Sequence, residues 1–200
     1  MMEKQNSKDV HKAPWHIYVA EVPHSEKGNV WVSFESTPDL EKTKANIYGK
    51  CLPCIQHLYE QLKERATDID LGSAYHCWKV TAVVEGMEQC LSLLRLYEEK
   101  FPEGHVYGKF GSGQPNSQTK VVVFHTENEA VRDQLRARLQ TCLETMKGKG
   151  EVQISRACGV LYGEILGDWR EWKPVTRIRH PEKVEALLDR IRKTLFWAAM

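Results

Sequence analysis

Between residues 74 and 157 the side chains follow two periods in a fixed order, and this order restricts the fold more than any other feature. Residues 74–84 are rich in β-branched and aromatic side chains, which is typical of a strand. Two short strands are expected at residues 105–110 and 119–125, on either side of the turn-rich sequence GSGQPNSQ. A last strand is expected from residue 151, where apolar and polar residues alternate.

Two helices are expected between these strands because apolar side chains recur there with the helical period. The first stripe contains Met87, Cys90, Leu91, Leu94 and Tyr97, and the second contains Val131, Leu135, Arg138, Leu139, Cys142 and Met146. The resulting order β-α-β-β-α-β is the split βαβ arrangement. We therefore predict an α+β protein with a ferredoxin-like βαββαβ core over residues about 74–157, in sheet order 4-1-3-2.

The flanking segments extend this core. Residues 1–13 are polar and aperiodic, which predicts a disordered lead, and residues 14–200 are expected to form a single α+β domain. Within residues 14–73 we expect a β-hairpin, with Val19 and Phe34 near the ends of its strands, and a helix in two pieces from Pro38 to Arg65. Residues 158–200 supply a segment rich in Gly and Trp and a final helix with the apolar stripe Val184, Leu187, Leu188, Ile191 and Leu195.

Composition excludes several classes of protein. With 42% hydrophobic and 28% charged residues, the 200-residue chain is not collagen-like, disordered or a disulfide scaffold. No apolar run approaches the roughly 18 residues of a membrane span, and the N-terminus lacks a secretory signal, so a cytoplasmic location is expected. The six cysteines are then expected to be reduced. The formal charge is +1 overall, and residues 147–200 carry 11 basic and 7 acidic residues.

Alternation along the strands separates two faces of the predicted sheet. Val106, Phe110, Val122 and Phe124 are expected to face the helices, as are Val152 and Ile154. Pairing Phe110 with Lys120 across the loop places His105 opposite His125, and on the same register it places Tyr107 opposite Val123 and Lys109 opposite Val121.

The open face has two interpretations. Tyrosines beside lysines on an exposed sheet can stack bases and neutralise phosphates. Alternatively the face is covered by the N-terminal hairpin and its helix, or by a second subunit, because Val83, Val121 and Val123 would otherwise be exposed.

The Cys51-Leu-Pro-Cys54 motif resembles the redox motif of the thioredoxin family over these four residues. The sequence EKTKANIYGK before it is helical, whereas that family has a strand there. Zinc would lack ligands, since a structural site needs four and His57 is the nearby candidate. Structural, redox and metal roles all remain open for this pair.

Two glycine-bearing segments could approach a phosphate. Residues 109–113 lie between two strands, and a hairpin turn is the favoured explanation for them, since phosphate-binding fingerprints require a helix after the loop. Residues 147–150 precede the last strand, a placement that resembles the glycine-rich loop of the repeat-associated RNA-processing proteins of CRISPR systems.

Trp169 and Trp172 lie about one helical turn apart, and either clamp a planar ligand or pack in the core.

These observations predict a binding or assembly protein, as a dimer or a subunit of a complex, that contacts RNA or a nucleotide-type phosphate without a cofactor or metal. The expected contacts are Lys79, Tyr107, Lys109, Gly111, Gly113, Lys147, Lys149 and Arg156. One alternative is a metal-independent RNA phosphodiesterase that uses His105 and His125 as acid and base. Another is a protein-interaction adaptor without a nucleic-acid ligand.

Overall fold

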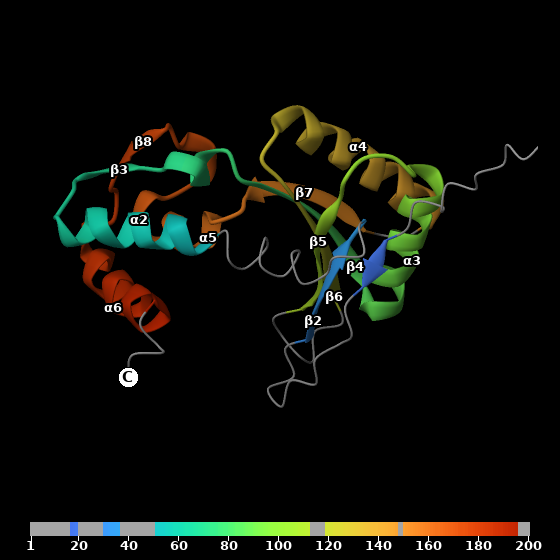
Figure 1. The fold of residues 1–200 in the computed structure, drawn as a ribbon, viewed down its shortest axis with the longest axis horizontal. Coiled ribbons are helices and arrows are strands. Elements are labelled where there is room, and N and C mark those ends of the chain that lie inside the picture. The colour runs from blue at the N-terminus through green and yellow to red at the C-terminus, as the bar shows by residue number, and fades with distance from the viewer. Residues whose placement is uncertain (1–16, 20–29, 37–50, 113–118, 148–149, 196–200) are drawn as a thin grey trace, which may run out of the picture.

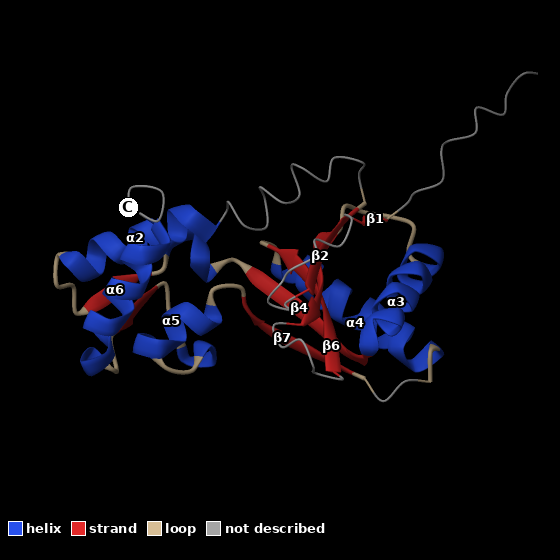
Figure 2. Cartoon of the chain, turned by 90° about the horizontal axis from the view of Figure 1, so that it is seen from below, coloured by secondary structure: helices blue, strands red, loops and turns tan. Residues whose placement is uncertain are grey.

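The computed structural model describes residues 17–19, 30–36, 51–112, 119–147 and 150–195. Over these residues the chain is an α+β protein with an antiparallel six-stranded sheet and five α-helices, which confirms the predicted class. Helices α3 and α4 pack along one face of the sheet, and α2, α5 and α6 form a separate group that is joined to it through β4 and β7 (Figures 1 and 2).

The main sheet has the order β1-β2-β5-β6-β4-β7, and each neighbouring pair is antiparallel. Strand β7 is therefore one edge. The strands are β1 (Tyr18–Val19), β2 (Val30–Glu35), β4 (Trp78–Glu85), β5 (Tyr107–Ser112), β6 (Thr119–Thr126) and β7 (Glu151–Arg156).

Helices α3 (Gly86–Lys100) and α4 (Glu129–Thr145) bury their apolar stripes against this sheet. Asn128 caps α4, since its side chain accepts a hydrogen bond from the Val131 amide at 3.1 Å. Val106, Phe110, Val122 and Phe124, which were predicted to face the helices, are all buried in this core.

A second core forms where residues 54–75 meet residues 158–195. Helices α2 (Cys51–Lys63), α5 (Gly159–Leu166) and α6 (Val184–Leu195) surround a short sheet of β3 (Asp68–Asp70) and β8 (Val175–Arg177). The predicted stripe of the last helix is confirmed, because Leu187, Leu188 and Ile191 are buried here. The 3₁₀ helices η2 (Gly72–Tyr75), η3 (Trp169–Glu171) and η4 (Pro181–Lys183) complete this part.

The predicted register between β5 and β6 is wrong by two residues. Phe110 lies opposite Val122 and not Lys120, and Lys109 lies opposite Val123 and not Val121. The reason is that β5 continues to Ser112, which pairs with Val30 of β2 on its other side. Because the register differs from the predicted one by an even number of residues, each side chain remains on the face of the sheet that was predicted for it.

The N-terminal hairpin is confirmed by the pairing of Tyr18 with Glu35 and of Val19 with Phe34. Its strand β2 extends the sheet at β5, so the described part of the hairpin adds an edge and does not cover the open face. Residues 1–13 and 37–50, to which a disordered lead and a first helical piece were assigned, lie outside the described residues.

Candidate functional site

Three of the predicted contacts gather on the open face of the sheet. Lys79 of β4 pairs with His125, Lys109 of β5 pairs with Val123, and Tyr107 lies two residues before Lys109. Burial lowers the pKa of Lys109, and the nearby charge of Lys79 lowers it further. The Lys109 ammonium lies 4.4 Å from the centroid of the Trp31 ring.

The aromatic rings of this face already stack on one another. The Tyr107 ring is stacked with that of His125, with centroids 6.2 Å apart, and its centroid lies 5.5 Å from that of His105. Val123 is only 4% exposed, and Val83 and Val121 are half-buried. The single chain thus partly buries the valines that suggested a dimer, and a base would have to displace the contacts that the Tyr107 ring already makes.

The two histidines are not directly opposite each other. The observed register places Tyr107 opposite His125, so His105 lies two residues before that position, ahead of the start of β5, and the Tyr107 ring contacts both. The Nδ1 atom of His105 lies 3.1 Å from Oε1 of the buried Glu35. This carboxylate orients the imidazole, and the catalytic role of the pair stays a prediction.

The remaining predicted contacts are dispersed. Gly111 lies within β5, opposite Trp31 and Val121, and Lys147 is exposed just after α4. Gly113 and Lys149 lie outside the described residues.

Arg156, at the end of β7, is the most buried of the predicted contacts. It is 6% exposed, and its guanidinium carbon lies 3.5 Å from the Trp78 ring centroid and 4.3 Å from that of Tyr75. Burial lowers its pKa. Within the described part of the chain, its Nε and Nη1 atoms have no hydrogen-bond partner, and it has no carboxylate in ion-pair contact. Glu129 acts on Arg156 through its charge without forming an ion pair with it, and Arg156 therefore places a largely uncompensated positive charge behind Trp78.

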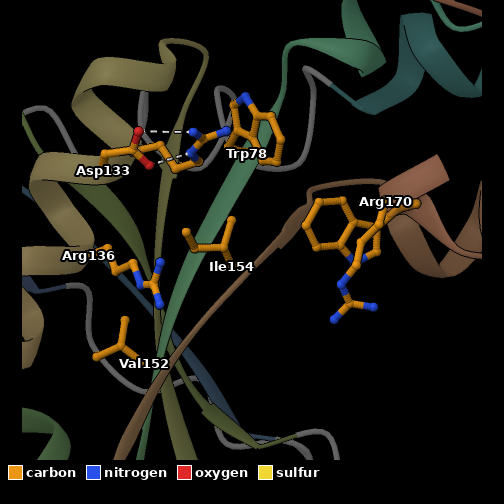
Figure 3. A pocket seen from close by; sticks show the side chains of 8 residues that line it. Trp78, Asp133, Arg136, Val152, Ile154 and Arg170 are labelled. Atoms are coloured by element: carbon orange, nitrogen blue, oxygen red, sulfur yellow. Dashed lines mark hydrogen bonds and ion pairs between the residues drawn. The ribbon is translucent and has the colours of Figure 1, made fainter. Parts of the chain in front are cut away.

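Trp78 forms one wall of a groove at the β7 edge of the sheet, with a volume of about 390 Å³ (Figure 3). Helix α4, strand β7 and η3 provide the other walls. The lining residues are Trp78, Arg132, Asp133, Arg136, Val152, Ile154, Trp169 and Arg170. Arg136 and Arg170 lie on opposite sides of Ile154 (Figure 3).

Local carboxylates neutralise two of the three lining arginines. Arg132 binds Asp133 at 2.8 and 3.0 Å, which holds the pKa of that carboxyl below its usual range. Arg170 binds Asp168 at 2.9 Å. Arg136 is exposed and has no hydrogen bond or ion pair to the described residues.

The aromatic wall is partly accessible. The faces of the buried Trp78 ring contact the guanidinium groups of Arg132 and Arg156, at 4.2 and 3.5 Å from its centroid. Trp169 packs edge-on against Trp78, with centroids 5.8 Å apart, and remains half-buried. The Arg170 guanidinium carbon lies 5.1 Å from the Trp169 ring centroid, so a planar ligand can stack on the part of the Trp169 ring that Arg170 leaves accessible.

The predicted clamp of two tryptophans is not present. Trp172 is 5% exposed and donates a hydrogen bond from Nε1 to the Gly167 carbonyl at 3.2 Å, within the second core. Core packing, the other interpretation, holds for Trp172, while Trp169 lines the groove.

Sequence reasoning missed this groove because the arginines of α4 resemble an ordinary solvated helix face. The available signal was the four-residue spacing of Arg132 and Arg136, which places both side chains on one side of a helix.

Searches of known protein families, curated proteins and solved structures found no match to this chain. None of the described helices is long and apolar enough to cross a membrane. Among the described residues, no group of three or more His, Cys, Asp or Glu side chains could hold a metal ion.

Proposed function

We propose that this protein binds RNA or a nucleotide-type phosphate ligand in the groove between α4, β7 and η3. The observation that carries the proposal is the convergence of Arg132, Arg136 and Arg170 on a pocket with a half-buried tryptophan. Guanidinium groups bind phosphate oxygens, and aromatic rings stack on bases. The buried Arg156 behind Trp78 adds to the positive potential.

The groove supports this function better than the open face does. On the open face the histidine and tyrosine rings contact each other and the Lys109 ammonium lies over Trp31. In the groove Arg136 forms no hydrogen bond or ion pair with the described residues, although its charge acts on Asp133, and the ion pair between Arg170 and Asp168 is exposed. Exposed pairs contribute only about 0–1 kcal/mol, so a phosphate can compete for Arg170.

The arrangement suggests how the ligand is held. A phosphate lies between Arg136 and Arg170, while the base stacks on Trp169 and the sugar contacts Val152 and Ile154. Asp133 holds Arg132 in place and repels phosphate from that side of the groove.

We also propose that residues about 74–157 form a ferredoxin-like core. It is supported by the strand order β7-β4-β6-β5 and by the two helices that follow β4 and β6 and pack on one face. A cytoplasmic location and a role as a dimer or a subunit remain predictions of the same proposal.

Binding to a short single-stranded RNA at several salt concentrations tests the function. Two phosphate contacts to a single strand predict that log affinity falls with log salt with a slope of about −1.4. Fluorescence anisotropy of a labelled oligonucleotide measures this slope, and a mononucleotide competitor shows whether one phosphate suffices. Absence of binding at low salt would overturn the proposal and favour the adaptor.

A further inference from the structure

Three cysteines meet where α2 and α5 begin, outside the groove. Cys51 and Cys54 lie in the first turn of α2, and Cys158 is the residue immediately before α5. The two helices meet at this point, because the buried Tyr162 hydroxyl of α5 donates a hydrogen bond to the Cys54 carbonyl of α2 at 2.9 Å. The fold thus brings together thiols that are more than 100 residues apart in sequence.

The three thiols lie close together. The Cys158 thiol is within hydrogen-bonding reach of Cys51 and of Cys54. Cys51 and Cys158 also line a pocket of about 430 Å³, mostly between apolar side chains of α2 and α5. Cys54 is deeper, at 9% exposure, and its Sγ lies 3.3 Å from the Ser73 hydroxyl.

The surroundings favour a thiolate at Cys51 and at Cys54, whose pKa values are both lowered to about 6, and of the two it is Cys51 that lines the pocket. The hydrogen bond from Cys158 lowers the pKa of Cys51 to about 6, and the charges of Lys79 and Lys109 act in the same direction. Cys158 has a single S–H and can donate it to one thiolate at a time, and its own pKa is raised. In contrast, burial raises the pKa of Cys90 and Cys142 to about 11.

We propose that Cys51 is a peroxide-reactive thiolate and that Cys158 is its resolving thiol. In the first step the Cys51 sulfur attacks hydrogen peroxide, an S–O bond forms and the O–O bond breaks. The released hydroxide takes up a proton and becomes water, which leaves a sulfenic acid on Cys51.

In the second step the Cys158 sulfur attacks the sulfenic sulfur. An S–S bond forms, the S–O bond breaks, and the leaving hydroxide takes the Cys158 proton to become water. Two thiols together lose two electrons and two protons, and the peroxide is reduced to two waters. Cys158 fits the resolving role because it contacts Cys51 in the open pocket, whereas Cys54 lies deeper beside Ser73.

The test begins with the reduced wild-type protein at pH 7. Cysteine-resolved mass spectrometry after timed alkylation is expected to show Cys51 reacting on the order of 10²-fold faster than Cys90 or Cys142. After treatment with one equivalent of hydrogen peroxide, non-reducing peptide mapping is expected to show a Cys51–Cys158 disulfide. Equal alkylation rates, or a disulfide between Cys51 and Cys54, would overturn the assignment.

Two variants distinguish the proposed resolving role of Cys158 from a role of Cys54. Cys158→Ser is expected to leave a sulfenic acid on Cys51 that dimedone traps, and Cys54→Ser is expected to form the Cys51–Cys158 disulfide as the wild type does. Loss of this disulfide in a folded Cys54→Ser protein would contradict the proposal. The alkylation of the wild type needs no variant, so the test stands even if a substitution prevents folding.

Discussion

Replacement of Gly108 by alanine is expected to lower the free energy of unfolding by about 3 kcal/mol or more. Gly108 lies in β5 between β2 and β6, opposite Phe34 on one side and Phe124 on the other. An added Cβ would lie 1.9 Å from the Val123 carbonyl oxygen and 2.6 Å from the Phe34 ring. The carbonyl belongs to the backbone of the neighbouring strand, so relief requires β5 and β6 to move apart.

Gly163→Ala provides the matched control. Gly163 lies within α5, and a Cβ there meets no atom within 4 Å. This substitution is expected to stabilise the protein by about 0.5–1 kcal/mol, because alanine loses less backbone entropy in a helix. Urea denaturation followed by circular dichroism measures both variants. A Gly108→Ala protein as stable as the wild type would contradict the described packing of β5.

Reversal of the two rim charges of the groove, in Arg136→Glu/Arg170→Glu, is expected to weaken RNA binding on the order of 10³-fold. Each charged hydrogen bond to a phosphate contributes about 1.5–3 kcal/mol, and the new carboxylates also repel the ligand. Both side chains are exposed on the groove rim, so the fold should tolerate the change. Fluorescence anisotropy at fixed low salt measures the loss.

Arg95→Glu/Arg192→Glu is the control for net charge. These two arginines are exposed on α3 and α6, away from the groove, and their reversal changes the formal charge by the same amount. The control is expected to retain affinity within about tenfold, since remote charges act through screened long-range attraction. Equal losses in both double variants would show that binding depends on overall charge and not on the groove.

The sequence was sufficient to predict the elements in which a regular side-chain pattern continues over many residues. The stripes of α3, α4 and α6 and the buried face of β5 and β6 follow directly from apolar spacing. The register of β5 and β6 did not follow, because the partner that extends β5 is β2, from a distant part of the chain. Strands β3 and β8 have three residues each, too few to show a period.

The groove and the thiol cluster could not be predicted from local patterns. The groove combines Trp78 of β4, arginines of α4 and residues of η3, which are brought together by the sheet order. Similarly, Cys51 and Cys54 were recognised as a motif, but their proximity to Cys158 depends on the meeting of the start of α2 with α5 in the folded chain. Arg156 was identified from its sequence position, although its burial between Tyr75 and Trp78 was not.

The site of ligand binding can be read from the tryptophan indole signals in a ¹H–¹⁵N NMR titration with single-stranded RNA. Trp169 and Trp78 line the groove, whereas Trp31 lies under the Lys109 ammonium and reports on the open face. The account predicts concentration-dependent shifts of the Trp169 and Trp78 signals, while that of Trp31 stays in place. Shifts of Trp31 with unchanged Trp169 and Trp78 signals would contradict binding in the groove.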